Sequence, residues 1–218
     1  APGFVAPIVN FSQEPCTIPV DNMPPCPPLL SVTTICEEPA NLLSWIKPAD
    51  TCPDDIAKYY ILFNPGLGTP IVIDSVSNPE DTSYLHRQPN AITGCYAVMA
   101  IDSVGNLSDT SNIVCIDMTA CPSYRLPNIF TPNGDGTNDY FVPFPGYTSV
   151  SSIALKIFDR WGKLVFETSD PASQWDGKDK TTEQPCSDGT YFFICDVSEI
   201  TLNGVVMRNI RGSLTILR

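Results

Sequence analysis

Proline is the feature that most restricts how this 218-residue chain can fold, since it occurs 22 times. Each proline fixes φ and removes a backbone N–H donor, which suits loops, strand edges and linkers and breaks the interior of a helix. The frequency is about 10%, roughly twice the average. A helical bundle is therefore excluded, and the chain must build its cores from short strands.

Short apolar or alternating runs, separated by turn residues about 8–14 positions apart, predict an all-β fold. The charge changes near residue 124: the chain up to this point holds three basic and 13 acidic side chains, and the rest holds nine and 11. We therefore expect a proline-rich leader over 1–28, a β-sandwich over 29–121 and a second β-sandwich over 125–218. The opening residues lack the features of an export signal, so the leader is interpreted as a linker from an upstream region.

The predicted strands are bounded by glycine, proline, asparagine and aspartate. Arg160-Trp161-Gly162 and Asn203-Gly204 predict hairpins in the second sandwich. The seven strands of the first sandwich are expected at 29–36, 41–47, 57–64, 70–76, 82–87, 94–103 and 111–118. Those of the second are expected at 140–144, 152–159, 163–168, 190–197, 205–207 and 213–217.

Charge and motif content exclude several functions. The formal net charge of −12 repels polyanions, so nucleic acid is not an expected partner. No apolar run approaches the roughly 18 residues of a membrane span, so no membrane insertion is expected. The single histidine, His86, lies in a predicted strand without a nucleophile motif beside it, and phosphate-binding and zinc-protease motifs are absent. We therefore expect neither an enzyme nor a bound cofactor.

Nine cysteines predict disulfide bonds and an oxidising, extracytoplasmic compartment. A structural zinc site would need closely spaced cysteine pairs, which the chain lacks. Because nine is odd, one thiol stays outside the intramolecular pairs, and Cys16 in the leader is the candidate. Spacing does not decide the connectivity, and the candidate pairs are Cys36–Cys95, Cys26–Cys52, Cys115–Cys121 and Cys186–Cys195.

One stretch of the second sandwich alternates oxygen-bearing side chains, as a structural Ca²⁺ site would require. The alternative is that these side chains cap tight turns without an ion, because the terminal glutamate of the twelve-residue calcium loop is missing. The candidate ligands are Asn133, Asp135, Thr137 and Asp139. A second oxygen set, for which turn formation is the simpler interpretation, is Asp176, Asp179 and Asp188.

The first predicted sandwich resembles a fibronectin type III or related immunoglobulin-like module over about 90 residues. Leu43-Ser44-Trp45 followed by Pro48, Tyr59-Tyr60-Ile61, and the run 96–102 with Gly105-Asn106-Leu107-Ser108 carry the resemblance. It implies a spacer rather than a binding site. Trp45 is the predicted central core side chain, and the run 94–103 is expected to be buried on both faces.

The second predicted sandwich carries a series of rarer motifs. They are Leu126 to Gly136, Asn138-Asp139, Ile157 to Gly162, Val165-Phe166, Trp175-Asp176-Gly177-Lys178, Asp188-Gly189-Thr190-Tyr191 and Gly212 to Arg218. In this order they resemble the gliding motility-associated C-terminal domain, the type B sorting domain of the Bacteroidetes type IX secretion system. The resemblance implies an immunoglobulin-like export address recognised by the type IX translocon and its outer-membrane recognition proteins. It also implies transit through the periplasm to the outer cell surface or the medium.

Three arginines near the end of this acidic chain, Arg208, Arg211 and Arg218, are candidates for the recognition surface, because guanidinium groups pair well with carboxylates. The alternative is that they solubilise an edge strand. We thus expect the export signal and spacer of a large, gliding adhesin-like protein. The alternatives are an adhesin-type module that binds polysaccharide, through Trp161 or Trp175, or a surface protein, and an accessory domain of an upstream enzyme.

Overall fold

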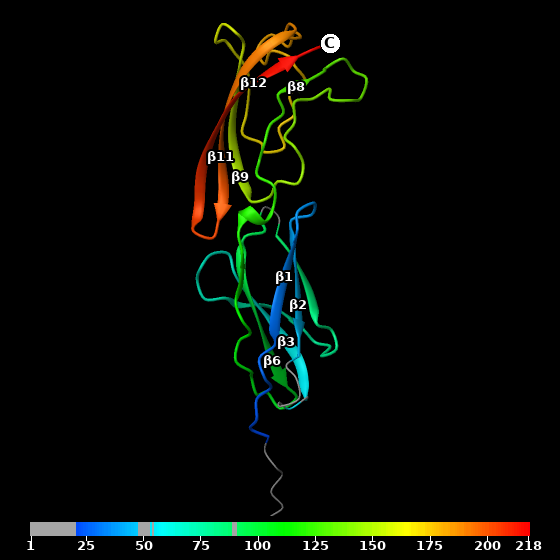
Figure 1. Cartoon of the computed structure of the whole chain (residues 1–218), viewed down its shortest axis with the longest axis vertical. Coiled ribbons are helices and arrows are strands. Elements are labelled where there is room, and N and C mark those ends of the chain that lie inside the picture. Colours follow the sequence, from blue (N-terminus) through cyan, green and yellow to red (C-terminus); the bar gives the residue numbers. More distant parts are fainter. Residues whose placement is uncertain (1–20, 48–52, 54, 89–90) are drawn as a thin grey trace, which may run out of the picture.

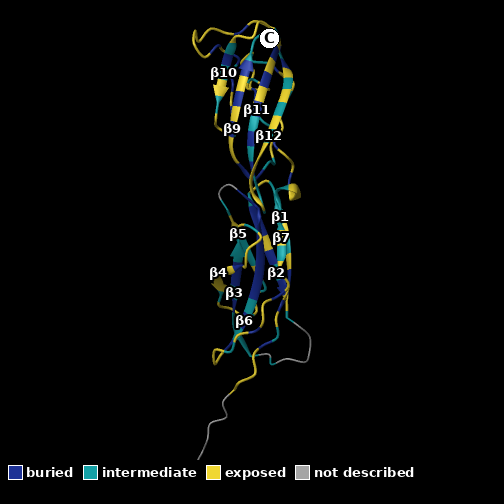
Figure 2. Ribbon diagram, turned by 90° about the vertical axis from the view of Figure 1, so that its left-hand side faces the viewer, coloured by how far each residue is buried: buried dark blue, intermediate teal, exposed yellow. Residues whose placement is uncertain are grey.

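The computed structural model describes residues 21–47, 53, 55–88 and 91–218. Two β-rich bodies follow each other along the long axis (Figure 1, Figure 2). We call the part that holds β1–β7 the first domain and the part that holds β8–β12 the second domain. Of the cysteine predictions, Cys16 and Cys52 lie outside the described residues, and Cys26 is disulfide-bonded.

The first domain is a sandwich of two antiparallel sheets, which confirms the predicted all-β fold of this region. One sheet has the order β1-β2-β5 and consists of β1 (Leu29–Ile35), β2 (Ala40–Ile46) and β5 (Ser83–Arg87). The other has the order β4-β3-β6-β7 and consists of β3 (Ile56–Asn64), β4 (Ile71–Val76), β6 (Gly94–Asp102) and β7 (Val114–Ile116).

The core between these sheets is built around Trp45 and Tyr59, whose rings meet edge to face at 5.1 Å. Trp45 is 2% exposed, which confirms its predicted central place. Strand β6 is buried on nearly its whole length and on both faces, as expected for a central strand. Aromatic burial of this kind dominates the stability of a small sandwich.

The second domain has one five-stranded sheet with the order β10-β9-β11-β12-β8. Its longest elements, β11 (Gly189–Thr201) and β12 (Gly204–Ile216), form the predicted hairpin, but the two-residue loop is Leu202-Asn203, one residue before the predicted Asn203-Gly204. The other strands are β8 (Ile129–Phe130), β9 (Val150–Phe158) and β10 (Leu164–Thr168).

The buried face of this sheet is covered by irregular chain rather than by a second regular sheet. The strand predicted at 140–144 is reduced to one bridge between Phe141 and Trp175. Both side chains are almost fully buried, so aromatic packing closes this layer where ladder hydrogen bonds do not. The runs predicted at 205–207 and 213–217 belong to one continuous strand, because β12 pairs with β11 along its whole length.

The structure corrects two predicted disulfides. Cys95 on β6 lies opposite Cys115 on β7 with the Cα atoms 4.0 Å apart, and these two cysteines are bonded. Cys36, which follows β1, is bonded to Cys121. The predicted pairs Cys36–Cys95 and Cys115–Cys121 are wrong, because the antiparallel β6–β7 ladder holds Cys115 beside Cys95. The short helix η1 (Met118–Ala120) then brings Cys121 to the end of β1.

The predicted pair Cys186–Cys195 is also wrong, since both cysteines are free and buried. Cys186 lies before β11, which begins at Gly189. Cys195 lies within this strand, six residues after Gly189. Six residues of extended chain span about 20 Å, whereas the Cα atoms of a disulfide lie within about 7 Å. The two thiols are separate parts of one apolar core.

The two domains meet through side-chain and backbone hydrogen bonds. Thr93 Oγ1 donates to the carbonyl of Ile200 at 3.1 Å, and its hydroxyl also bonds to that of Ser149. At the tip of the β11–β12 hairpin, the N–H of Leu202 donates to Asp117 at 3.3 Å. The hairpin tip therefore marks the proximal end of the second domain, the end that faces the first domain.

Candidate recognition site

At the other end of the second domain, which we call the distal end, lies the glycine-rich loop 131–139. The carboxylate of Asp139 accepts hydrogen bonds from Gly134 N at 2.6 Å and Gly136 N at 2.8 Å, and these donors lower its pKa. Both glycines have positive φ, near 81° and 85°, which explains why glycine is needed there. The loop is thus held in one shape by its own side chains.

The other candidate calcium ligands bond within the same loop. Asn133 Oδ1 accepts from Asp135 N at 3.0 Å, and Asp135 Oδ1 accepts from Thr137 N at 2.8 Å. These are side-chain-capped turns of the kind that asparagine and aspartate form without a metal. A structural Ca²⁺ at this loop stays a prediction. Of the second oxygen set, Asp176 and Asp179 bind lysines and nearby amides instead.

The segment Trp175–Lys178 anchors this loop to the sheet. The Trp175 side chain is 1% exposed, packs against Phe130 and Phe166, and donates from Nε1 to the carbonyl of Lys178 at 2.7 Å. A Cβ atom on Gly177 would lie 3.1 Å from Pro132 and 3.3 Å from Phe130. The glycine therefore allows the two segments to approach closely.

The end of the chain joins the same place. Arg218 Nη1 donates to the carbonyl of Cys186 at 2.6 Å and to Asp188 Oδ1 at 2.9 Å. Arg160, in the turn between β9 and β10, also lies close to this end. Its guanidinium is so near Gly189 that a Cβ atom on this glycine would lie 3.1 Å from it. Next to Arg160, the side chain of Trp161 is 86% exposed. Motifs far apart in sequence therefore gather beside the C-terminus (Figure 1).

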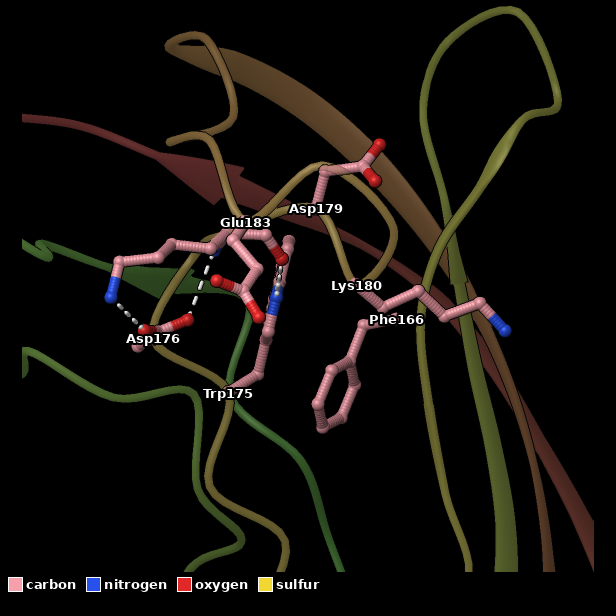
Figure 3. Close-up of a pocket in the computed structure, with 7 residues that line it drawn as sticks. Phe166, Trp175, Asp176, Asp179, Lys180 and Glu183 are labelled. Carbon is pink, nitrogen blue, oxygen red and sulfur yellow. Dashed lines mark hydrogen bonds and ion pairs between the residues drawn. The ribbon is translucent and has the colours of Figure 1, made fainter.

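A pocket of about 420 Å³ opens at the distal end, and Figure 3 shows the facing rings of Trp175 and Phe166 in its wall. Its rim carries acidic and basic side chains, of which Lys178 pairs with Asp176 at 2.6 Å. Asp179 and Lys180 pair instead with Lys163 and Glu167, which lie outside the lining. Its lining residues are Phe166, Trp175, Asp176, Lys178, Asp179, Lys180 and Glu183.

The three predicted recognition arginines do not form one surface. Arg208 lies on the buried side of β12, where its guanidinium binds Glu199 and donates to the carbonyl of Tyr124 at 3.0 Å. Arg211 lies three residues further, on the opposite, exposed face of the strand, beside Asn209. Only Arg218 belongs to the distal end, so Arg208 is assigned a structural role.

His86 also has a structural environment. Its Nδ1 lies 2.9 Å from the hydroxyl of Tyr96, its ring packs against Phe63, and burial lowers its pKa. Burial beside aromatic neighbours favours the neutral imidazole over the charged one.

Comparison with known proteins finds a family similar to the second domain. Residues 124–216 match the family model of the CHU_C type IX secretion signal domain. The second domain is therefore similar to type IX secretion signal domains. The match confirms the resemblance found in the sequence, and it spans every motif segment of the distal end except the last two residues of the chain. We refer to this part of the chain as the sorting domain.

Solved structures of fibronectin type III arrays are similar to the whole chain. The chicken CNTN1 FN1–FN3 domains share 14% identity over 87% of this chain and 68% of theirs, with a TM-score of 0.34. The central fibronectin III array of RIM-binding protein shares 13% identity over 90% of this chain and 71% of its own, with a TM-score of 0.33. No curated protein gives a significant match. The fold assignment rests on the strand order rather than on these likenesses.

Acid should weaken the sorting domain through Asp179. Lys163 Nζ lies 2.6 Å from Asp179 Oδ2, and this contact, with two backbone donors, lowers the pKa of Asp179 to about 2. A depressed carboxyl pKa contributes stability that is fully present above the unfolded value of about 3.9 and is lost as the pH falls towards 2. We expect the urea midpoint to fall more steeply between pH 4 and pH 2 in the native protein than in Asp179→Asn.

Lys163→Met removes the same contact from the other side and should flatten the same part of the pH profile. Equal slopes for the native protein and both variants would contradict the assignment.

Proposed function

We propose that the type IX translocon recognises the distal end of the sorting domain. The observation that supports this most strongly is the convergence of loop 131–139, the Trp175 segment, the β9–β10 turn and Arg218 at one end. This end is separated from the first domain by the length of β12, about 40 Å for 13 extended residues. A partner can therefore reach it without contacting the first domain.

We further propose that the first domain is the spacer of a large adhesin-like protein displayed on the outer cell surface after passage through the periplasm. The disulfides Cys36–Cys121 and Cys95–Cys115 support an oxidising destination. Among the described residues, no helix is long and apolar enough to cross a membrane. The matched family is a secretion signal rather than a catalytic domain, in line with a role in recognition instead of chemistry.

Export of a reporter tests the proposal. The whole chain, and residues 125–218 alone, are fused after an inert periplasmic reporter in a bacterium with type IX machinery. We expect both fusions to reach the medium or cell surface. Combined Trp161→Ala and Arg218→Ala substitution should reduce export at least tenfold, because it removes the exposed ring and the cation of the distal end.

Arg211→Ala is the matched control, since it removes an exposed arginine of β12 that lies outside the distal end. Circular dichroism and urea midpoints of the purified variants separate lost recognition from lost folding. Undiminished export of a folded distal-end variant would refute recognition at this end, and retention of both native fusions would refute the export function.

The exposure of Trp161 also supports a second candidate, an adhesin-type module that stacks this ring on a sugar. Here Trp161→Ala should abolish binding on a glycan array while export of the fusion stays unchanged. Loss of export without any glycan binding by the native chain would exclude this candidate.

A further inference from the structure

Three carboxylates meet at the end of the first domain that lies farthest from the sorting domain. Asp21 belongs to the segment before β1, Asp55 precedes β3, and Asp102 ends β6. One carboxylate oxygen from each lies within 4.8 Å of the others. In Figure 1 the described chain begins at this lower end, in blue.

Asp102 is held rigidly within this group. It is 3% exposed, and its Oδ1 accepts from the N–H groups of Val104, Gly105 and Asn106 at 2.7–3.0 Å. Although burial opposes ionisation, these donors together with the Asn106 side chain lower the pKa of Asp102. A negative charge is therefore maintained inside the fold.

Asn106 brings the upstream segment to this charge. Its Nδ2 donates to Asp102 Oδ2 at 2.7 Å and to the backbone carbonyl of Asp21 at 3.1 Å. The Asp21 carboxylate in turn accepts from Met23 N at 2.9 Å. One amide thus clamps two of the three acidic residues.

Asp55 supplies the independent observation that points to a ligand. Its Oδ1 atom is fully buried and has no hydrogen-bond partner, although two other carboxylates lie beside it. A buried acceptor without a donor costs about 1–3 kcal/mol, and more when it is charged. None of the ion pairs between described residues involves Asp21, Asp55 or Asp102.

We propose that these three carboxylates bind a Ca²⁺ ion that fastens the segment around Asp21 to the first domain. Ca²⁺ binds oxygen at 2.3–2.6 Å, so oxygens on opposite sides of one ion are about 5 Å apart, which matches the 4.8 Å limit of the group. The ion supplies the missing partner of Asp55 Oδ1 and neutralises two of the three charges. Mg²⁺ binds at about 2.1 Å in a stricter octahedron and fits this spacing less well.

The location indicates a structural role at the point where the preceding chain enters the domain. Extracellular calcium modules bind with Kd values of about 10⁻⁴–10⁻³ M. A site of this affinity stays unloaded at low calcium and fills at millimolar concentrations. The ion would therefore stiffen this joint once the protein reaches a calcium-rich exterior. This inference is independent of how the sorting domain is recognised.

Calorimetric titration of the disulfide-bonded whole chain with CaCl₂ tests the site. We expect the three carboxylates to bind one Ca²⁺ with Kd in the range of about 10⁻⁴–10⁻³ M and at least tenfold weaker binding of Mg²⁺. At 10 mM Ca²⁺ the melting transition of the first domain should rise by about 5–10 °C relative to EGTA. Asp55→Asn and Asp21→Asn should each weaken binding at least tenfold.

Two matched controls make the test specific. Asp109→Asn changes an exposed aspartate of the same domain, and Asp135→Asn changes the oxygen-rich loop of the sorting domain. Both should retain the Ca²⁺ ion that depends on Asp55.

Four outcomes would overturn the proposal. They are absence of binding at 10 mM Ca²⁺, unchanged binding in Asp55→Asn, equal affinity for Mg²⁺, and loss of the Asp55-dependent ion in Asp135→Asn. A shared proton between Asp55 and Asp21 is the alternative explanation of the group. In that case Asp55→Asn stabilises the chain equally with and without Ca²⁺, and this result also overturns the proposal.

Discussion

Trp175→Ala should lower the free energy of unfolding of the sorting domain by about 4 kcal/mol, the range found when a large buried aromatic side chain is removed. The indole is 1% exposed and packs against Phe130, Phe166 and Tyr191, so the substitution leaves a cavity that rigid neighbours cannot fill. For a domain of this size the melting temperature should fall by at least 15 °C. Differential scanning calorimetry of the whole chain measures the change.

Trp161→Ala is the matched control, because it removes the same side chain from a position that is 86% exposed. It should change stability by no more than about 0.5 kcal/mol. Trp175→Phe should be intermediate, since it keeps a ring but leaves the Lys178 carbonyl without its indole donor. Equal melting temperatures for the two alanine variants would contradict the central place of Trp175.

Replacing Cys36 and Cys121 by serine should destabilise the first domain by about 4 kcal/mol. The bond spans 85 positions, and closing a loop of this length removes much of the entropy of the unfolded chain. Cys121 directly precedes the sorting domain, so its loss should also loosen the joint and speed hydrogen exchange at Leu202 N, which bonds to Asp117. Urea unfolding and amide exchange measure the two effects.

The Cys95–Cys115 bond closes only 20 positions, so its removal should cost about 3 kcal/mol by the same reasoning. It lies within the β6–β7 ladder, away from the joint, and should leave exchange at Leu202 unchanged. A Cys36/Cys121 double variant as stable as the native protein, or equally slow exchange at Leu202 in both variants, would show that the bond does not brace the joint.

Local signals predicted most of the secondary structure. The two hairpins followed from Asn203-Gly204 and Arg160-Trp161-Gly162, since positive φ at glycine and a short loop are visible in the sequence. Trp45 was predicted as the core of the first domain because a large apolar residue in an alternating strand must be buried. The strand predicted at 140–144 does not form beyond a single bridge. The packing of its side chains, rather than a ladder of backbone hydrogen bonds, determines the structure of this segment.

The ion pair between Glu199 and Arg208 was missed, although the hairpin register contains it. A two-residue loop places Glu199 opposite Val206 and Arg208 opposite Val197, so the two charged side chains are diagonal neighbours on one face. Considering this register would have removed Arg208 from the recognition candidates. The contact between Arg218 and Asp188 could not be predicted in this way. It depends on the path of the chain after β12, which no strand register determines.

Turn residues, hydrophobic periodicity and proline content are local features of the sequence. Together with the sorting motifs, they were enough to predict a chain of two β-domains of which the second is a sorting domain. The disulfide connectivity, the gathering of the sorting motifs at one end and the meeting of Asp21, Asp55 and Asp102 depend on strand order and loop closure. These link residues up to about 90 positions apart, and only burial of the common cores selects which of the many alternative pairings is formed.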